Sequence, residues 1–332
     1  MLYLDNGNQH DPALNLALEE YALKHLPAEN DYLLFYINEP SIIIGKNQNT
    51  AEEVNADYVA EHGIHVVRRL SGGGAVFHDH GNLNFSFITR DDGKSLHNFR
   101  KFTEPVVQAL RALGVEAELT GRNDLQVGER KISGNAQFAT RGRMFSHGTL
   151  LFDSEVDHIV AALNVNPAKF QSKATKSVRS RVANIKEFLS ESMTIDEFKR
   201  SLLESIFGGV ASSSIPRYRM SEEQWAAVRQ LAEERYRSWE WNYGSSPAFN
   251  VRQVKRLEGV GTFDVRLNVV EGIIREAAVY GDFFGAGDVA DVAQRLIGVR
   301  YEASAIDQAL ADVDLSAYFG PVDRQEWLGL LI

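Results

Sequence analysis

The chain has 332 residues, of which 44% are hydrophobic and 24% charged, with a formal net charge of −10 and no cysteine. The missing thiols exclude disulfides, thiolate metal sites and cysteine nucleophiles, and the acidic balance argues against non-specific nucleic-acid binding. No run approaches the ~20 apolar residues that cross a bilayer, and the N-terminus lacks a basic segment typical of a secretory signal. We therefore expect a cytoplasmic protein that binds neither membranes nor nucleic acid.

The N-terminal part of the chain alternates between helical and strand-like segments. A helix is predicted from Asp11-Pro12, because proline is tolerated in a first turn. Short apolar runs rich in β-formers then predict strands at 31–37, 41–45, 63–70 and 82–89.

The middle of the chain continues in the same mixed way. A helix fits residues 97–113, closed by Gly114. Strands are predicted at 131–138 and 146–153, with a hairpin turn at 141–143. Two more helices begin with capping-box pairs, Thr194 with Glu197 and Ser221 with Gln224, and the second is expected to reach Tyr236.

A linker composition, Gly-Ser-Ser-Pro, occurs within residues 238–250. Three strands and two or three short helices are expected after it, so we predict a first domain at 1–245 and a C-terminal accessory domain at 246–332. Because regular βαβ alternation is absent, the fold class is predicted as α+β, with a mostly antiparallel sheet, flanking helices and a small α+β C-terminal domain. Trp239, Trp241 and Tyr243 alternate like a packing ridge and are expected in a core.

A run of three glycines, Gly72 to Gly74, follows Arg68-Arg69 and a predicted strand. Glycines let a backbone approach a ligand and offer its N–H groups, and arginines can bind phosphate or carboxylate oxygens in bidentate fashion. The alternative is an ordinary glycine-rich turn with solvated arginines. The pattern matches neither common nucleotide-binding glycine loop.

Three further groups of residues invite chemical interpretation. Asn123-Asp124 could orient a ribose, a phosphate or a hydrated Mg²⁺, whereas Lys131, by spacing alone, is a surface lysine on a strand. Six cationic side chains occur between Lys169 and Lys186 without an acidic residue, which predicts an anion-binding loop or a solvated basic one. His78, His80 and His147 suggest a metal site, since His78 and His80 could share a strand face, but the absence of a third ligand at a recognisable spacing favours ordinary pocket or core histidines.

Together these segments resemble the lipoate–protein ligase A family of the biotin/lipoate ligase superfamily. The matching pieces are NLALEE (15–20), RRLSGGGAVFHD (68–79), GNLNFSF (81–87), GRNDL (121–125), KISGNAQ (131–137), HGTLLFD (147–153), SVRSRVANI (177–185) and WEWNYGSSPAF (239–249). The resemblance implies a carbon–nitrogen ligase that uses ATP and Mg²⁺ to make lipoyl-AMP. The resemblance further implies that this ligase transfers the lipoyl group to a lysine of 2-oxoacid dehydrogenase E2 lipoyl domains or the glycine-cleavage H protein.

The resemblance also assigns roles to individual residues. Lys131 falls on the family's catalytic lysine, which touches both the lipoyl carbonyl and the adenylate phosphate. The positions implied for ATP and adenylate are Arg69, Gly74, Ala75, Val76, Phe77, Asn123, Asp124, Lys131, Lys173, Arg179 and Arg181. Those implied for lipoate are Ser71, Gly72, Gly73, His78, Lys131 and His147, with Asp124 as a candidate Mg²⁺ ligand.

Other readings stay open at this point. An octanoyl- or lipoyl-transferase or an amidotransferase of the superfamily is the nearest, although several of these use a cysteine that the chain lacks. A biotin–protein ligase is disfavoured because its GRGRxGRxW-like stretch is missing, and an inactive lipoate-binding protein is disfavoured by intact Lys131, Asn123 and Asp124. We expect a monomer; the sequence leaves open the preferred acceptor, the choice between lipoate and octanoate, and any need for a second protein.

Overall fold

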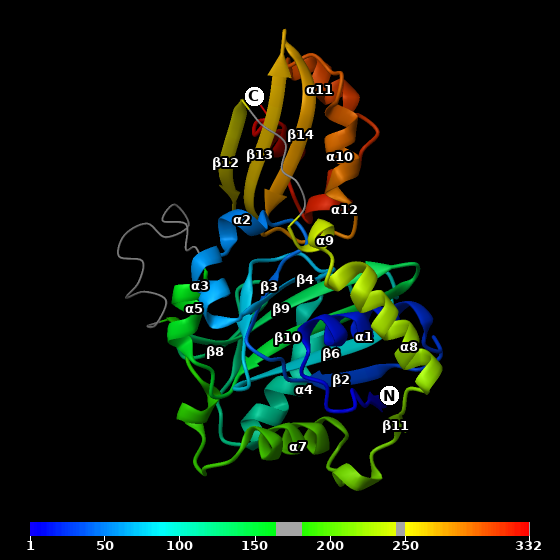
Figure 1. Cartoon of the computed structure of the whole chain (residues 1–332), viewed down its shortest axis with the longest axis vertical. Helices are drawn as coiled ribbons and strands as arrows, with labels where there is room; N and C mark the ends of the chain where they lie inside the picture. Colours follow the sequence, from blue (N-terminus) through cyan, green and yellow to red (C-terminus); the bar gives the residue numbers. More distant parts are fainter. Residues whose placement is uncertain (164–180, 244–249, 332) are drawn as a thin grey trace. The chain divides into compact units, whose positions relative to one another are not determined.

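The computed structural model describes residues 1–163, 181–243 and 250–331 (Figure 1). The chain forms two compact units. The first contains Met1–Ile44, Ala51–Arg68 and Ala75–Asn242, and the second contains Gly45–Thr50, Arg69–Gly74 and Tyr243–Ile332. The proposed domain boundary at 245/246 lies outside the described residues.

The first unit is built on an eight-stranded sheet with the order β11-β1-β2-β6-β10-β9-β8-β7. Its strands are β1 (Leu2–Leu4), β2 (Tyr32–Tyr36), β6 (Asn82–Arg90), β7 (Glu118–Thr120), β8 (Asp124–Val127), β9 (Arg130–Thr140), β10 (Arg143–Leu151) and β11 (Arg217–Tyr218). β1 runs parallel to β2 and β11, and the other neighbours are antiparallel. The prediction of a mostly antiparallel sheet with flanking helices is confirmed.

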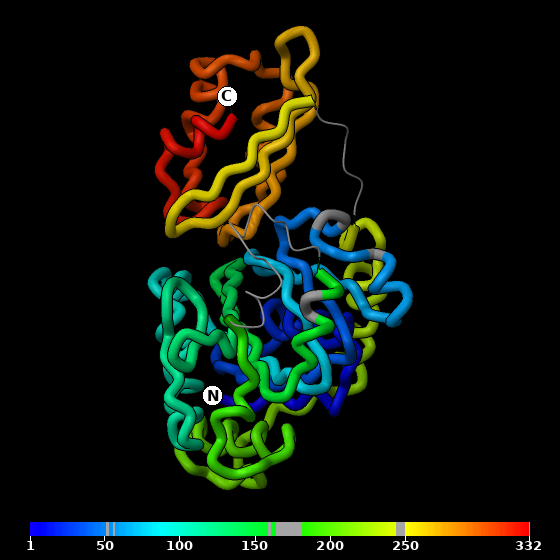
Figure 2. The backbone as a smooth tube through the Cα atoms, turned by 90° about the vertical axis from the view of Figure 1, so that its left-hand side faces the viewer, coloured from blue at the N-terminus to red at the C-terminus, as the bar shows by residue number. Residues whose placement is uncertain are grey.

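Helices cover both faces of this sheet. α4 (Phe99–Ala112) and α7 (Ile195–Ile206) enclose the main core with the apolar side chains of β6 and β10. α1 (Pro12–His25) contacts β6 and β10, and it packs against α8 (Glu222–Leu231) and the π-helical turn Ala232–Tyr236. In Figure 2 the blue N-terminal segment is surrounded by later parts of the chain, in keeping with the burial of most of α1.

A second, three-stranded sheet carries the segments on either side of the glycine run. Its order is β4-β3-β5, with β3 at Ser41–Ile44, β4 at His65–Arg68 and β5 at Val76–His78. The remaining helical elements of this part of the chain are α2 (Thr50–Glu53), α3 (Ala56–His62), α5 (Val156–Ala162), α9 (Trp239–Asn242) and 3₁₀ turns at Ile185–Phe188 and Ser212–Ser214.

The second unit contains the antiparallel sheet β12 (Val251–Leu257), β13 (Gly261–Val270) and β14 (Ile273–Gly281). The helices α10 (Val289–Leu296), α11 (Ala303–Ala309), α12 (Leu315–Phe319) and α13 (Arg324–Leu328) follow. Its core stacks Phe263 on Phe283 at 4.6 Å and Phe319 on Trp327 at 4.8 Å between ring centroids. Within residues 250–331 the three expected strands are confirmed, and four short helices follow them where two or three were expected.

Local sequence signals explain several element boundaries. The Asp11 side chain accepts hydrogen bonds from Ala13 N and Leu14 N and so begins α1. Both predicted capping boxes form, at Thr194 and at Ser221. The β9–β10 hairpin turns through Arg141 and Gly142 with φ of 50° and 74°, as primed hairpin turns require.

The expectation of a packing ridge at 239–243 is wrong for two of its three members. Trp239 is 57% exposed and Tyr243 40% exposed. The alternation suggested one face of a strand, but the segment forms the helical turn α9, in which residues two apart point in different directions. Trp241 alone packs inward, with its ring beside Tyr236 and the Arg235 guanidinium. Across the part of the chain that is described, no helix is long and apolar enough to cross a membrane.

Candidate functional site

Lys131 lies near the start of β9, where its side chain meets a carboxylate from β8. Its Nζ is 2.9 Å from Asp124 Oδ1, and each side chain is about one-third exposed (36% and 33%). Asp124 pairs in register with Gly134, and a Cβ built on Gly134 would lie 3.1 Å from Lys131 Nζ. The ladder between β8 and β9 shifts register beside Leu125, which lets Lys131 reach over this glycine. The lysine therefore occupies space that any larger residue at position 134 would contest.

Asn123, predicted to contact the nucleotide, is joined to Asn135 on the neighbouring strand. Asn123 Nδ2 donates to the Asn135 carbonyl at 2.6 Å, while Asn135 N and Nδ2 donate to the Asn123 carbonyl at 3.0 and 2.9 Å. These bonds fix the backbone just before Asp124. Its amide thus supports the turn that aims Asp124 at Lys131, and its contact with a nucleotide stays a prediction.

The glycine run belongs to the second unit, where it wraps around Arg69. The guanidinium donates from Nε to Ser71 Oγ at 2.9 Å and from Nη2 to the carbonyls of Gly72 and Gly74 at 2.7 and 2.8 Å. Arg68 is used differently, because its guanidinium donates to backbone carbonyls of α9 in the first unit. The two adjacent arginines therefore both organise backbone in this structure.

Packing explains two of the three glycines. A Cβ on Gly72 would lie 2.3 Å from the Phe283 carbonyl oxygen, and Gly73 has φ of +92° with the Phe284 ring 2.8 Å from its Cβ position. Gly74 differs, since its Cβ position has no neighbour within 4 Å among the described residues and its φ is not positive. The interpretation of the run as a ligand-binding backbone therefore depends on Gly74.

Ala75 leads into β5, which contains Val76, Phe77 and His78. Val76 and Phe77 pair with β3, and the Phe77 side chain is buried in a core with β3, so a ligand would meet the backbone of these residues. The strand ends at His78, which is buried, whereas His80 lies beyond it and is exposed. The shared strand face proposed for a His-X-His metal site is thus missing. The described residues hold no group of three or more His, Cys, Asp or Glu side chains suited to a metal ion.

His147, on β10, forms a buried pair with Glu19 of α1. The imidazole Nδ1 lies 2.9 Å from Oε1 and 3.1 Å from Oε2 of the carboxylate. The Phe145 ring lies beside the imidazole at 4.7 Å between centroids. Sequence reasoning named His147 but missed Glu19; the available signal was a carboxylate in the largely apolar segment NLALEE.

The basic segment is described only at its end. Lys173 and Arg179 lie outside the described residues, and Arg181 is exposed. The chain just after Arg181 adds to β9: Val182 bridges Lys131, and Ala183 N donates to the Lys131 carbonyl at 2.9 Å. The end of the basic segment is therefore fixed to the strand that carries the candidate catalytic lysine.

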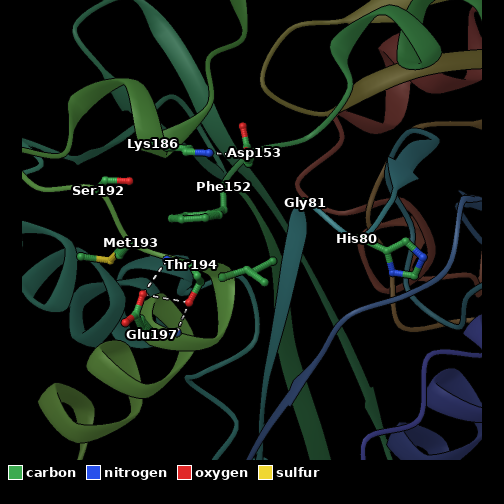
Figure 3. Close-up of a pocket in the computed structure, with 10 residues that line it drawn as sticks. His80, Gly81, Phe152, Asp153, Lys186, Ser192, Met193, Thr194 and Glu197 are labelled. Atoms are coloured by element: carbon green, nitrogen blue, oxygen red, sulfur yellow. Dashed lines mark hydrogen bonds and ion pairs between the residues drawn. The ribbon is translucent and has the colours of Figure 1, made fainter.

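Two cavities open near the ends of β5 and β10, and sequence reasoning did not anticipate them. One, of about 490 Å³, is lined by Phe152, Lys186 and the first residues of α7; Figure 3 shows Lys186 directed at Asp153, 2.5 Å away. The other, of about 300 Å³, is lined by His62, Phe77 and His158, among others. Among the residues singled out from the sequence as candidates for binding, His80 and Lys186 line the first cavity, and Phe77 and His80 line the second.

Known proteins resemble the chain over its whole length. Residues 11–207 match the family described as "Lipoyl protein ligase A/B catalytic domain", and residues 246–331 match "Bacterial lipoate protein ligase C-terminus". A lipoate–protein ligase of Bacillus subtilis (strain 168) is 58% identical over 331 residues, covering 100% of both chains.

Solved structures extend the likeness. One describes a bi-partite lipoate protein ligase and its E2 lipoyl domain from Thermoplasma acidophilum. It is 33% identical with a TM-score of 0.64, and the match covers 75% of this chain and 98% of that one. Another, a lipoate-protein ligase A bound with ATP, is 31% identical with a TM-score of 0.61, and the match covers 74% of this chain and 97% of that one.

Proposed function

Because the chain belongs to the lipoate–protein ligase family, we propose that it activates lipoate with ATP and transfers the lipoyl group to a specific lysine of an acceptor protein. The observation that carries this proposal is Lys131, held beside Asp124 over the side-chain-free surface of Gly134. A cation so placed is suited to an acyl-phosphate anhydride, which develops negative charge at two neighbouring oxygens.

In the first step the lipoate carboxylate attacks the α-phosphorus of ATP, and pyrophosphate leaves. Charge accumulates on the α-phosphate oxygens, and the Lys131 ammonium stabilises it. In the ligand-free protein Lys131 is paired with Asp124, and Lys131 would exchange this carboxylate for the anionic ligand. The Asp124 carboxylate, a partly exposed oxygen ligand, would hold Mg²⁺, which would supply positive charge for the departing pyrophosphate.

In the second step the acceptor lysine attacks the acyl carbonyl of lipoyl-AMP, and AMP leaves. Lys131 remains beside the carbonyl oxygen and stabilises the negative charge of the tetrahedral intermediate. No enzyme nucleophile takes part, which agrees with a sequence that contains no cysteine. The cysteine-dependent acyltransferases of the superfamily are disfavoured on the same ground.

The acceptor is proposed to be an E2 lipoyl domain or the glycine-cleavage H protein, since the Thermoplasma acidophilum ligase is described together with its E2 lipoyl domain. We further propose that the ligase acts as a cytoplasmic monomer with a catalytic part at 1–245 and an accessory part at 246–332. Arg69, Gly74 to Phe77, Lys173, Arg179 and Arg181 are proposed to contact the adenylate. Ser71 to Gly73, His78 and His147 are proposed to contact lipoate.

Pyrophosphate release with lipoate and ATP tests this proposal, followed by mass spectrometry of an E2 lipoyl domain. The wild-type chain should release pyrophosphate only when lipoate is present and should add one lipoyl group to the acceptor. Lys131→Ala should lower the rate of lipoyl-AMP formation by at least ~10²-fold, the scale of losing one preorganised group that stabilises transition-state charge. Its thermal midpoint should stay close to wild type, because the side chain is partly exposed and its ion pair contributes little. Lipoyl-AMP formation by the variant at the wild-type rate would contradict the assignment of Lys131.

A further inference from the structure

Two adjacent carboxylates of α1 are buried, and their surroundings differ. Glu20, 1% exposed, is neutralised by fixed cations: Lys24 and Arg235 lie 2.6 and 2.5 Å from its Oε1, and the Tyr236 hydroxyl donates to Oε2 at 2.7 Å. Burial and this carboxylate raise the pKa of Tyr236 well above its usual value, so the phenol keeps its proton. Glu20 therefore has the surroundings of a structural ion pair.

Glu19, 2% exposed, has no lysine or arginine paired with it among the described residues. Within the described part of the chain, its carboxylate makes hydrogen bonds to His147 alone. A buried carboxylate is costly unless it is paired, and here the partner is a side chain that can gain and lose a proton. This arrangement is typical of a carboxylate–histidine proton-transfer pair.

The contact with Glu19 also determines which imidazole nitrogen of His147 carries the proton. An ionised carboxylate can only accept hydrogen bonds, so His147 Nδ1 carries the proton that faces Glu19. Nε2 is then the nitrogen that exchanges a proton, and a positive charge on the ring would be stabilised by Glu19.

His78, the other histidine predicted to contact lipoate, accepts a hydrogen bond at Nδ1, the nitrogen that donates in His147. The Gln9 carbonyl can only accept, so Asn15 Nδ2 must face it, at 3.0 Å; the same amide donates to Asn38 Oδ1 at 2.9 Å. Asn38 Nδ2 is then the atom that donates to His78 Nδ1 at 3.0 Å. His78 is thus held neutral with its proton on Nε2, which makes it a donor and leaves His147 as the candidate proton acceptor.

His147 lies on the face of the sheet that carries Lys131. It pairs in register with Ala136, two residues beyond Gly134, over which Lys131 Nζ lies. Side chains in such diagonal positions of neighbouring strands are about 7–8 Å apart at the backbone, within reach of long and aromatic groups. The Phe145 ring flanks the imidazole on one side along β10. From their register, the His147 and Lys131 side chains lie near each other on this face of the sheet.

From this geometry, and building on the ligase function proposed above, we infer that His147 accepts a proton from the acceptor lysine during lipoyl transfer and that Glu19 is a positioning residue for it. The lysine arrives as an ammonium ion, and His147 Nε2 takes one proton to leave the neutral amine. The amine nitrogen then bonds to the acyl carbon, the bond from that carbon to the phosphate oxygen breaks, and the second nitrogen proton leaves with AMP. The imidazolium, stabilised by Glu19, releases its proton to water before the next cycle.

Competition between two nucleophiles tests this inference in the full-length chain. Preformed lipoyl-AMP on the enzyme is offered either an E2 lipoyl domain or hydroxylamine, which is largely unprotonated at neutral pH and traps the acyl group as a hydroxamate. Only the lysine needs a base to remove its first proton. For Glu19→Gln and His147→Gln, the lysine-to-hydroxylamine rate ratio should fall by ~10²-fold or more, the usual contribution of a general base. Added imidazole should restore part of the lysine rate in His147→Ala.

Glu20→Gln is the matched control, because it removes a neighbouring buried carboxylate of the same helix. It should lower the thermal midpoint and leave the ratio unchanged. Since both rates come from the same preparation, partial unfolding cancels in the ratio, and Glu19→Asp gives a milder second variant. Equal losses toward lysine and hydroxylamine would show that the pair only shapes the lipoate pocket and would overturn the inference. Failure of the wild-type chain to form lipoyl-AMP would instead contradict the proposed function.

Discussion

Gly134→Ala is expected to displace the end of the Lys131 side chain without destabilising the fold. The added Cβ would lie 3.1 Å from Lys131 Nζ, 3.2 Å from its Cε and 4.0 Å from Asp124 Oδ1. Comfortable contacts between such atoms are about 3.5–4.0 Å, so the end of the lysine must move by a few tenths of an ångström while Asp124 can stay. The backbone accepts alanine because φ at this position is not positive.

The expected effects on stability and on rate differ in size. Replacing glycine by alanine at a compatible site contributes about 0.4–1 kcal/mol to stability, which offsets a weakened surface ion pair of similar size. A misplacement of 1 Å costs a reaction about 10²-fold, so half that displacement should slow lipoyl-AMP formation by about 10-fold. The variant should therefore melt close to wild type and release pyrophosphate about ten times more slowly.

The assay is pyrophosphate release with lipoate and ATP, alongside thermal denaturation of the same samples. Gly329→Ala is the control, because φ there is −65° and the nearest atoms to its Cβ position lie at 3.4 and 3.6 Å. A Gly134→Ala enzyme that is folded and releases pyrophosphate at the wild-type rate would refute the reasoning. Lys131 would then not be confined over this glycine when the reaction occurs.

Three other expectations follow from packing and charge. Gly74→Ala should weaken lipoate or ATP binding in calorimetric titration and leave the thermal midpoint unchanged. Gly73→Ala should instead destabilise the fold by about 1–3 kcal/mol, because φ at this position is +92°. Unchanged ligand affinity in Gly74→Ala would show that the glycine run is an ordinary turn. Phe263→Ala should lower the free energy of unfolding of its unit by about 3–5 kcal/mol in urea denaturation, since the fully buried ring stacks on Phe283; a loss below 1 kcal/mol would contradict this packing. His97 is exposed, yet partial desolvation, assisted by Arg122, lowers its pKa, so the unfolded chain binds the proton first and stability should fall as pH drops below about 6.5. His97→Asn, which tolerates the φ of +67°, should reduce that loss when urea denaturation is compared at pH 7 and pH 5; an identical pH dependence would exclude His97 as its source.

Local signals predicted the elements whose determinants lie close together in the sequence. The Asp11 cap and the Ser221 capping box each involve residues a few positions apart, and both helices begin where predicted. The strands β1, β7 and β11 escaped prediction because two or three residues are too short to show a period of two. Residues 69–70 were included in a predicted strand, but β4 ends at Arg68, where the chain leaves for the glycine run.

In the candidate site, too, contacts between residues close in the sequence were predictable and contacts between distant residues were not. Asp124 and Lys131 are seven positions apart on a hairpin, so their pairing was within reach of sequence reasoning. Glu19 and His147 are 128 positions apart and meet only because α1 packs on β10. The role of Arg69 in holding the glycine run was equally hidden, because its partners are backbone carbonyls that every sequence contains.

The second unit combines three separate segments of the chain, so a cut near residue 245 would divide it between two polypeptides. Segments 45–50 and 69–74 group with the C-terminal residues, through bonds such as Gly281 N to the Asn47 carbonyl at 2.7 Å and Gly73 N to the Phe283 carbonyl at 3.3 Å. A chain cut at Ser245 would leave these segments on one polypeptide and the sheet that they contact on the other. Contacts that now benefit from a high effective concentration would become an association equilibrium. Two separately produced halves would therefore reconstitute this unit in proportion to their concentration, and dilution alone would take it apart.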